Sequence, residues 1–253
     1  MQKFSASTYA FISCLFVFLL LIPIDAKAQM FSVSSSSVPQ NGAPFVMPST
    51  LGPLLEFTDF NYYGPNRDGG PAVGYNFNGV LYGASFETPF LSVFIADRTS
   101  LGDEENIRAT RLGIGVRSPA IITADPNYVI SIPFGLNTDF TLVRTPSTSN
   151  TNEEFAQNAG YISAGIDGIF RISGNIIFQT VSTPNFGYTV GSYGSTGGVS
   201  YKLKQDFRLI MADLYRQYGL QAGYSFQFVR FNNSDSDFRY DWLSHSIRLA
   251  VSF

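Results

Sequence analysis

Residues 199–211 read Val199-Ser200-Tyr201-Lys202-Leu203-Lys204-Gln205-Asp206-Phe207-Arg208-Leu209-Ile210-Met211. Every second position is apolar or aromatic apart from Gln205, and the positions between are polar as far as Arg208. This period of two predicts a β-strand with one apolar and one polar face. The pattern returns over 216–228, slips at Val229, and returns over 247–253 after a turn at 232–237. Strands of soluble sheets are usually about 5–6 residues long, whereas these runs suit a tilted strand of about 9–11 residues crossing a bilayer.

The composition of the 253-residue chain agrees with such strands. Charged residues make up 14%, well below the roughly 25% typical of soluble domains. The mean hydropathy of +0.07 is too polar for a bundle of membrane helices. A net charge of −3 gives no support to nucleic-acid binding. The single cysteine, Cys14, excludes a disulfide framework.

The N-terminus has the pattern of a secretory signal. Lys3 precedes an apolar core over 11–24, and Ala26-Lys27-Ala28 is a small-x-small cleavage site. Lipidation of Cys14 and an uncleaved anchor are the less favoured alternatives. We therefore assign residues 1–28 to a signal peptide, 29–50 to an N-terminal extension or linker, and 51–253 to the folded domain. No later apolar stretch is long enough for a spanning helix, so an exported chain of this kind is soluble or a β-barrel.

Alternation and turn signals divide 51–253 into about ten strands, with eight or twelve also compatible. The expected strands cover about 52–62, 72–86, 89–97, 106–118, 128–142, 157–172, 176–190, 199–211, 216–231 and 240–253. A change of phase near Gly79 predicts a β-bulge. Pro133 argues mildly against the fifth strand or predicts a local bulge there. Long connections alternate with short ones, except that 119–127 is long where a short one is expected. This asymmetry predicts an antiparallel up-and-down transmembrane β-barrel, with long loops outside and both termini in the periplasm.

The chain ends Tyr240-Asp241-Trp242-Leu243-Ser244-His245-Ser246-Ile247-Arg248-Leu249-Ala250-Val251-Ser252-Phe253. This ending resembles the closing strand of bacterial outer-membrane β-barrel proteins, and the whole sequence is similar in style to small barrels of the Bacteroidota. The resemblance implies residence in the bacterial outer membrane, in contact with its lipids and lipopolysaccharide. It also implies a terminal signal read by the barrel-assembly machinery, with Ile247, Leu249, Val251 and Phe253 at the signal positions. It identifies no functional subfamily.

Strand polarity predicts what lies on each face of the barrel. We expect Tyr240 and Trp242 in an outer aromatic girdle, and Tyr218 and Phe253 in a periplasmic one. Alternation places nine charged residues inside the barrel: Arg111, Arg117, Asp167, Arg171, Lys202, Lys204, Asp206, Arg208 and Arg248. Glu56 is a further candidate. Arg230 is ambiguous, because strict alternation turns it outward and the slip at Val229 turns it inward.

Two interpretations of this interior remain open. A basic lumen could pass or bind an anion, or the arginines could pair with acids and fill a narrow barrel. About eight strands enclose just enough space for side chains, and aqueous pores appear at about 16–18. With ten strands we expect a packed or very narrow lumen.

Residues suited to catalysis or metal binding are few. His245, the only histidine, shares the lipid-facing phase of Ile247, and its neighbours Ser244 and Ser246 point to the opposite face. The segment 233–237 is the best candidate for calcium, but it lacks the glycine and distal glutamate of an EF-hand loop. We expect no cofactor, no metal and no enzymatic activity, and a role in small-solute passage, structure or surface binding. The alternatives are a lipid-modifying enzyme using His245 and a soluble exported β-sandwich.

Overall fold

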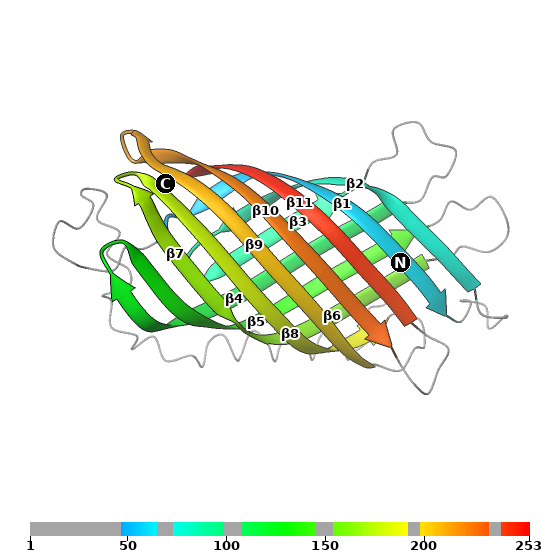
Figure 1. Ribbon diagram of the computed structural model, residues 1–253. Helices are drawn as coiled ribbons and strands as arrows, with labels where there is room; N and C mark the ends of the chain where they lie inside the picture. Colours follow the sequence, from blue (N-terminus) through cyan, green and yellow to red (C-terminus); the bar gives the residue numbers. More distant parts are fainter. Residues whose placement is uncertain (1–46, 65–72, 99–107, 145–153, 192–197, 233–238) are drawn as a thin grey trace, which may run out of the picture. The chain divides into compact units, whose positions relative to one another are not determined.

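The computed structural model describes residues 47–64, 73–98, 108–144, 154–191, 198–232 and 239–253 (Figure 1). The predicted signal peptide, and the predicted extension up to residue 46, lie outside these residues. Within the described part, no helix is long and apolar enough to cross a membrane. The strands are β1 (Thr50–Gly64), β2 (Val73–Glu87), β3 (Leu91–Asp97), β4 (Arg108–Asp125), β5 (Tyr128–Arg144), β6 (Glu154–Ala164), β7 (Ile166–Ser173), β8 (Ile176–Gly191), β9 (Gly198–Tyr215), β10 (Tyr218–Asn232) and β11 (Arg239–Ser252).

These strands form one closed antiparallel sheet. Apart from β6 and β7, each strand pairs with its neighbours along the chain, and β1 pairs with β11 to close the barrel. The segments β6 and β7 both lie between β5 and β8, and they follow each other without a change of register. The two segments therefore fill the place of a single strand in the barrel wall, and the barrel has ten such places. The predicted transmembrane-type barrel of about ten strands is confirmed.

Pro133 and Gly165 account for the break between β6 and β7. The flanking pairs Ser131–Asp167 and Phe134–Ala164 place Pro133 opposite Gly165. Proline has no N–H to donate to the ladder, so the hydrogen bonding is interrupted there. Gly165 also lies close to β8, since a Cβ on it would stand 2.0 Å from the carbonyl oxygen of Ser182. The bulge predicted at Pro133 is wrong, because β5 keeps its register with β4 there and shifts between Ile121 and Thr123.

Two other irregularities expected from the sequence are absent. The register between β1 and β2 runs unbroken through Gly79, so the predicted bulge there is wrong. On β10 the register is equally regular through Val229, and Arg230 follows strict alternation to the outer face. Leu81 and Val229 are buried inside the barrel. Apolar character at these two positions therefore does not show that the side chain faces lipid.

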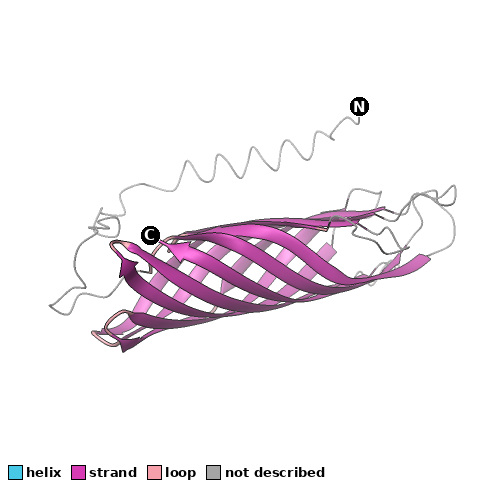
Figure 2. Ribbon diagram, turned by 90° about the horizontal axis from the view of Figure 1, so that it is seen from above, coloured by secondary structure: helices cyan, strands magenta, loops and turns pink. Residues whose placement is uncertain are grey.

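The connections place the two ends of the barrel. Strand β4 continues to Asp125, and a two-residue turn follows, so the predicted long connection at 119–127 is wrong. All the short connections, at 88–90, 126–127, 174–175 and 216–217, therefore lie at one end, the turn end, where Phe253 also lies (Figure 2). The longer connections, at 65–72, 99–107, 145–153, 192–197 and 233–238, join strands at the opposite, loop end. Two backbone hydrogen bonds between Ser49 and Phe253, at 3.1 and 2.9 Å, join the two chain ends at the seam.

The outer surface is apolar between two belts of tyrosine. Its exposed aliphatic and aromatic side chains come from the outward phase of every strand, as a lipid-facing wall requires. Exposed tyrosines stand near the loop end at Tyr63, Tyr188 and Tyr201, and near the turn end at Tyr128, Tyr215 and Tyr218, with Tyr82 and Tyr224 between them. Phe253 is also exposed at the turn end. Such belts are typical of membrane–water interfaces.

Candidate functional site in the barrel interior

The loop end of the interior is filled by an aromatic cluster of Phe60, Phe155, Phe231, Tyr240 and Trp242. Each of these side chains is at most 5% exposed. The Phe60 ring centroid lies 5.0 Å from that of Phe155 and 5.2 Å from that of Trp242, and Phe231 stacks on Tyr240 at 5.6 Å. Such contacts add to the stabilisation from burial. The prediction that Tyr240 and Trp242 belong to an outer girdle is wrong, because they share the inward phase of Ser244 and Arg248.

A second apolar cluster occupies the turn end. It contains Val129, Ile169, Ile177 and Ile210, which face inward from β5, β7, β8 and β9, together with Met47. Met47 precedes β1 in the chain and is 8% exposed. The last residues before β1 therefore pack into the barrel, in a region where the sequence predicted a linker.

Between the two clusters lies a polar layer, and its first element is the pair Arg111–Glu56. The Arg111 guanidinium donates to the Glu56 carboxylate, and the side chains are 3% and 4% exposed. The indole Nε1 of Trp242 donates to the same carboxylate at 3.3 Å. The Arg111 Cζ also lies 4.7 Å from the Trp242 ring centroid and 5.3 Å from that of Phe94. This pair thus joins the polar layer to the aromatic cluster.

A second buried pair crosses the barrel. The Lys202 ammonium lies 2.6 Å from Asp139 Oδ2, with both side chains at most 8% exposed. The same ammonium lies 5.0 Å from the Tyr161 ring centroid. Because these residues come from β9, β5 and β6, the pair links walls that are distant in sequence.

The largest group in the polar layer is a five-membered charge cluster of Glu87, Lys204, Asp206, Arg208 and Arg248. Arg208 lies 2.7 Å from Glu87 and 3.4 Å from Asp206, and Arg248 contacts both acids. Lys204 Nζ lies 3.1 Å from Asp206.

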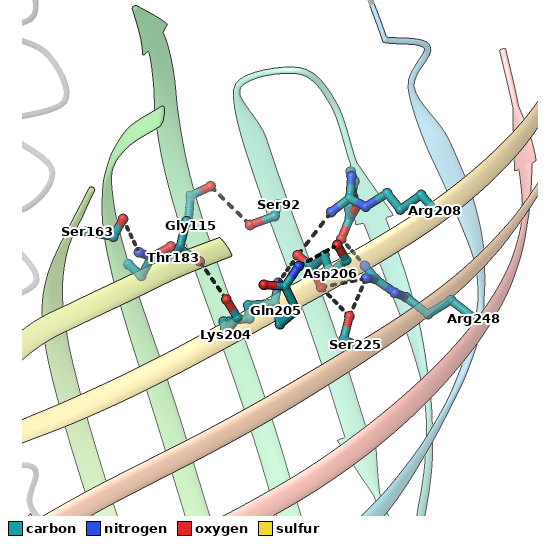
Figure 3. A network of polar contacts seen from close by, with 12 residues as sticks. Ser92, Gly115, Ser163, Thr183, Lys204, Gln205, Asp206, Arg208, Ser225 and Arg248 are labelled. Atoms are coloured by element: carbon teal, nitrogen blue, oxygen red, sulfur yellow. Dashed lines mark hydrogen bonds and ion pairs between the residues drawn. The ribbon is translucent and has the colours of Figure 1, made fainter. Parts of the chain in front are cut away.

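The hydroxyl of Ser225 completes this arrangement. It donates to Asp206 and accepts a hydrogen bond from Arg248 (Figure 3). Two carboxylates, Glu87 and Asp206, are therefore shared in ion pairs by three cations.

The remaining predicted lumen residues lie nearer the turn end. Asp167 accepts two hydrogen bonds from Gln179 Nε2, at 2.9 and 3.0 Å. Arg117 Nε donates to the carbonyl oxygen of Pro89 at 3.0 Å. Arg171 lies on β7 in the phase of Asp167 and is partly buried. All nine charged residues expected inside the barrel thus fall in the inward phase of their strands.

The polar layer surrounds a cavity of about 100 Å³. Six basic side chains line it, Arg111, Arg117, Lys202, Lys204, Arg208 and Arg248, with four acidic ones, Glu56, Glu87, Asp139 and Asp206. The rest of its polar lining is mostly hydroxyl and amide groups, including Thr183, Gln227 and Ser244.

Sequence reasoning missed two of the acids. Asp139 lies in the inward phase between Leu136 and Phe140, so the alternation of β5 carried the signal. Glu87 ends β2, and the supposed bulge at Gly79 obscured the phase of that strand. Both are at most 7% exposed, and both hold cations.

The residues considered for other activities lie elsewhere. His245 is on the outer face, and its Nδ1 lies 2.6 Å from the Tyr224 hydroxyl. Ser244 lies inside, at 2% exposure. Among the described residues, no group of three His, Cys, Asp or Glu side chains could hold a metal ion. The calcium candidate at 233–237 lies outside them.

The side chains of the C-terminal signal positions all face outward. Ile247, Leu249, Val251 and Phe253 are between 45% and 63% exposed. They form an apolar row on the outer surface of the closing strand.

Several solved bacterial outer-membrane proteins resemble this chain in strand arrangement at very low sequence identity. The outer-membrane protease OmpT from Escherichia coli is 9% identical with a TM-score of 0.47, over 87% of this chain and 99% of that one. The beta domain of the Bordetella autotransporter BrkA is 11% identical with a TM-score of 0.30, over 78% and 98%. The attachment invasion locus protein Ail of Yersinia pestis is 10% identical with a TM-score of 0.24, over 81% and 99%. No protein-family model matches the sequence, and no curated protein matches it significantly.

The class of the protein follows from its own architecture. An antiparallel sheet that closes on itself leaves no unpaired edge in lipid. Its outer wall is apolar, with tyrosine belts near both ends, and its inner face is polar at mid-height. The chain therefore has the architecture of a membrane-spanning antiparallel β-barrel.

Proposed function

We propose that this protein is a closed, non-enzymatic barrel that serves the outer membrane as a structural or surface-binding protein and does not pass solutes. The observation that carries the proposal is the filling of the interior. An apolar cluster occupies each end, and the charges between them are largely held in ion pairs. A solute crossing the barrel would have to displace both clusters and separate buried pairs, which is costly.

The loop end provides the surface for binding. Its connections are acidic in sequence, with Asp68, Asp103, Glu104, Glu105 and Glu153 among their residues. A rigid barrel that presents variable loops is a common basis for recognition. In this proposal the wall contacts outer-membrane lipids and lipopolysaccharide, and the outward row from Ile247 to Phe253 engages the assembly machinery.

Conductance measurements in planar lipid bilayers test the closed state. The purified barrel should give no resolvable current steps under conditions in which a water-filled porin, added to the same membranes, does. Replacement of Phe60 and Phe231 with alanine, in the aromatic cluster, serves as a second reference because it enlarges the loop end. Reproducible steps from the unaltered protein would refute the closed barrel and favour passage of small solutes.

A lipid-modifying enzyme is the second candidate, and the surroundings of His245 give it little support. A general base needs a nucleophile within hydrogen-bond reach. Here Nδ1 is engaged by the Tyr224 hydroxyl, and Phe226 packs against the ring at 5.3 Å. These contacts suit a histidine that is part of the lipid-facing wall.

A further inference from the structure

The charges around the central cavity do not balance. Six cations and four carboxylates line it, and the buried carboxylate of Asp167, which attracts Arg117, is a fifth acid beside it, so one positive charge is in excess. Glu56 forms an ion pair with Arg111, and Asp139 forms one with Lys202. Glu87 and Asp206 are shared by Arg208, Arg248 and Lys204. Uncompensated charge inside a barrel is expensive, because the surrounding lipid and protein solvate it poorly.

The excess can be assigned to Lys204. No described carboxylate lies within ion-pair distance of Arg117, whose Nε donates to a backbone carbonyl, but Asp167 attracts this guanidinium and compensates its charge. Among the described carboxylates, Asp206 is the one within ion-pair distance of Lys204, and it also receives Arg208, Arg248 and Ser225. The Lys204 side chain is 29% exposed, against 3–5% for Arg111, Lys202, Arg208 and Arg248. Its ammonium is therefore better able than theirs to meet a ligand.

Neutral donors accompany Lys204 at the same level of the barrel. The strand register places Thr183, Lys204, Gln227 and Ser244 side by side on β8, β9, β10 and β11, and all four line the cavity. Gln227 is 7% exposed, and its amide nitrogen has no hydrogen-bond partner among the described residues. A buried donor without a partner is costly, so it points to a ligand that accepts hydrogen bonds.

We propose that this cavity binds one small oxyanion of the phosphate or sulfate class, with Lys204 and Gln227 as ligands. The negative charge of the oxyanion compensates the excess at Lys204. Its several acceptor oxygens suit a lining of ammonium, guanidinium, amide and hydroxyl donors. The volume of about 100 Å³ equals about three water molecules at roughly 30 Å³ each, which is room for one tetrahedral oxyanion. The site does not depend on the proposed surface role, because it lies inside the closed barrel.

Equilibrium dialysis of the purified barrel against radiolabelled inorganic phosphate, and separately against sulfate, tests the proposal. Chloride sets a constant ionic strength, and the barrel is refolded both with and without the anion, so that slow entry does not hide binding. We expect saturable uptake of about one anion per chain. The variant K204Q should weaken it by about tenfold or more, since it removes a charged donor. R230Q removes an exposed cation from the outer wall and should leave the uptake unchanged.

The variant Q227E distinguishes a bound anion from bound water, and it applies even if K204Q does not fold. It adds a carboxylate of nearly the same shape beside Lys204. It should abolish phosphate and sulfate uptake while the protein stays folded without either anion, as judged by heat-modifiable migration on gels. The absence of saturable uptake by the unaltered barrel, or uptake unaffected by Q227E, would overturn the site. Equal loss in R230Q would also overturn it, because the anion would then be held on the surface.

Discussion

Replacing Glu56 with glutamine tests whether buried ion pairs hold the barrel wall together. The change keeps the size of the side chain and removes its charge. Arg111 would remain inside with its guanidinium 3% exposed and no charged partner. Glu56 also accepts the indole N–H of Trp242 at 3.3 Å, and the amide oxygen of glutamine can still accept that bond. The cost therefore reports mainly on the ion pair.

The expected magnitude follows from the burial of the pair. Breaking a buried ion pair by removing one partner typically costs about 3–5 kcal/mol, because a charge is left without compensation. The contact of Arg111 with the Trp242 ring, at 4.7 Å, retains part of the favourable interaction. We therefore expect E56Q to lower the free energy of unfolding by about 3 kcal/mol. With an m-value of about 2 kcal/mol/M, the urea midpoint falls by about 1.5 M.

The assay has a built-in reporter. Trp242 is the only tryptophan in the chain, is 2% exposed, and touches both members of the pair. Its fluorescence during urea titration of the barrel in lipid vesicles follows unfolding, and heat-modifiable migration on gels gives an independent measure. The double variant E56Q/R111M should recover part of the loss, because it removes both charges together.

A matched control lies on the outer surface. Arg230 and Asp241 form a pair with Nε 2.8 Å from Oδ1, but their side chains are 58% and 43% exposed. An exposed pair contributes about 0–1 kcal/mol, so D241N should change the urea midpoint by less than about 0.5 M. If E56Q and D241N shift the midpoint equally, or if E56Q/R111M is less stable by the full sum of the single variants, the assigned role of the buried pair is wrong.

Three further predictions concern a strand position, the chain end and the histidine. G165A should destabilise the barrel by about 1–3 kcal/mol, since the new Cβ would meet the Ser182 carbonyl oxygen at 2.0 Å, while G174A, with nothing within 4 Å, should be nearly neutral; equal urea midpoints would contradict the close packing. F253A should lower the amount of folded protein in outer-membrane fractions while F253Y should not, and normal levels of F253A would contradict the assembly signal. H245A should leave phospholipid and lipid A profiles unchanged relative to the unaltered protein, and a profile matching that of cells lacking the protein would revive the enzymatic alternative.

The sequence predicted the architecture well because strand alternation is a local property. Successive side chains of a strand point to opposite faces, and the resulting alternation in the sequence was enough to predict a closed barrel of about ten strands. Arg230, which the sequence left ambiguous, follows strict alternation to the outer face.

The errors share one physical cause, which is that apolar side chains face both the lipid and the barrel interior in this protein. Near the loop end the inward face is apolar as well as the outward one, since Phe60, Leu81, Val229 and Trp242 are all buried inside. In the sequence these residues look like a slip of phase, a bulge or an outer girdle. Only the register of neighbouring strands distinguishes the two faces.

The sequence by itself determined that the chain forms about ten two-faced strands and that charge lies within the barrel, because these follow from the period of two and from residue type. The tertiary structure alone decided which charges meet. Lys202 and Asp139 are 63 residues apart, and Arg248 and Glu87 are 161 apart, yet each pair is in contact. Closure of the sheet brings such residues to the same height inside the wall. The curvature and register that set this height depend on the whole barrel, which no single strand encodes.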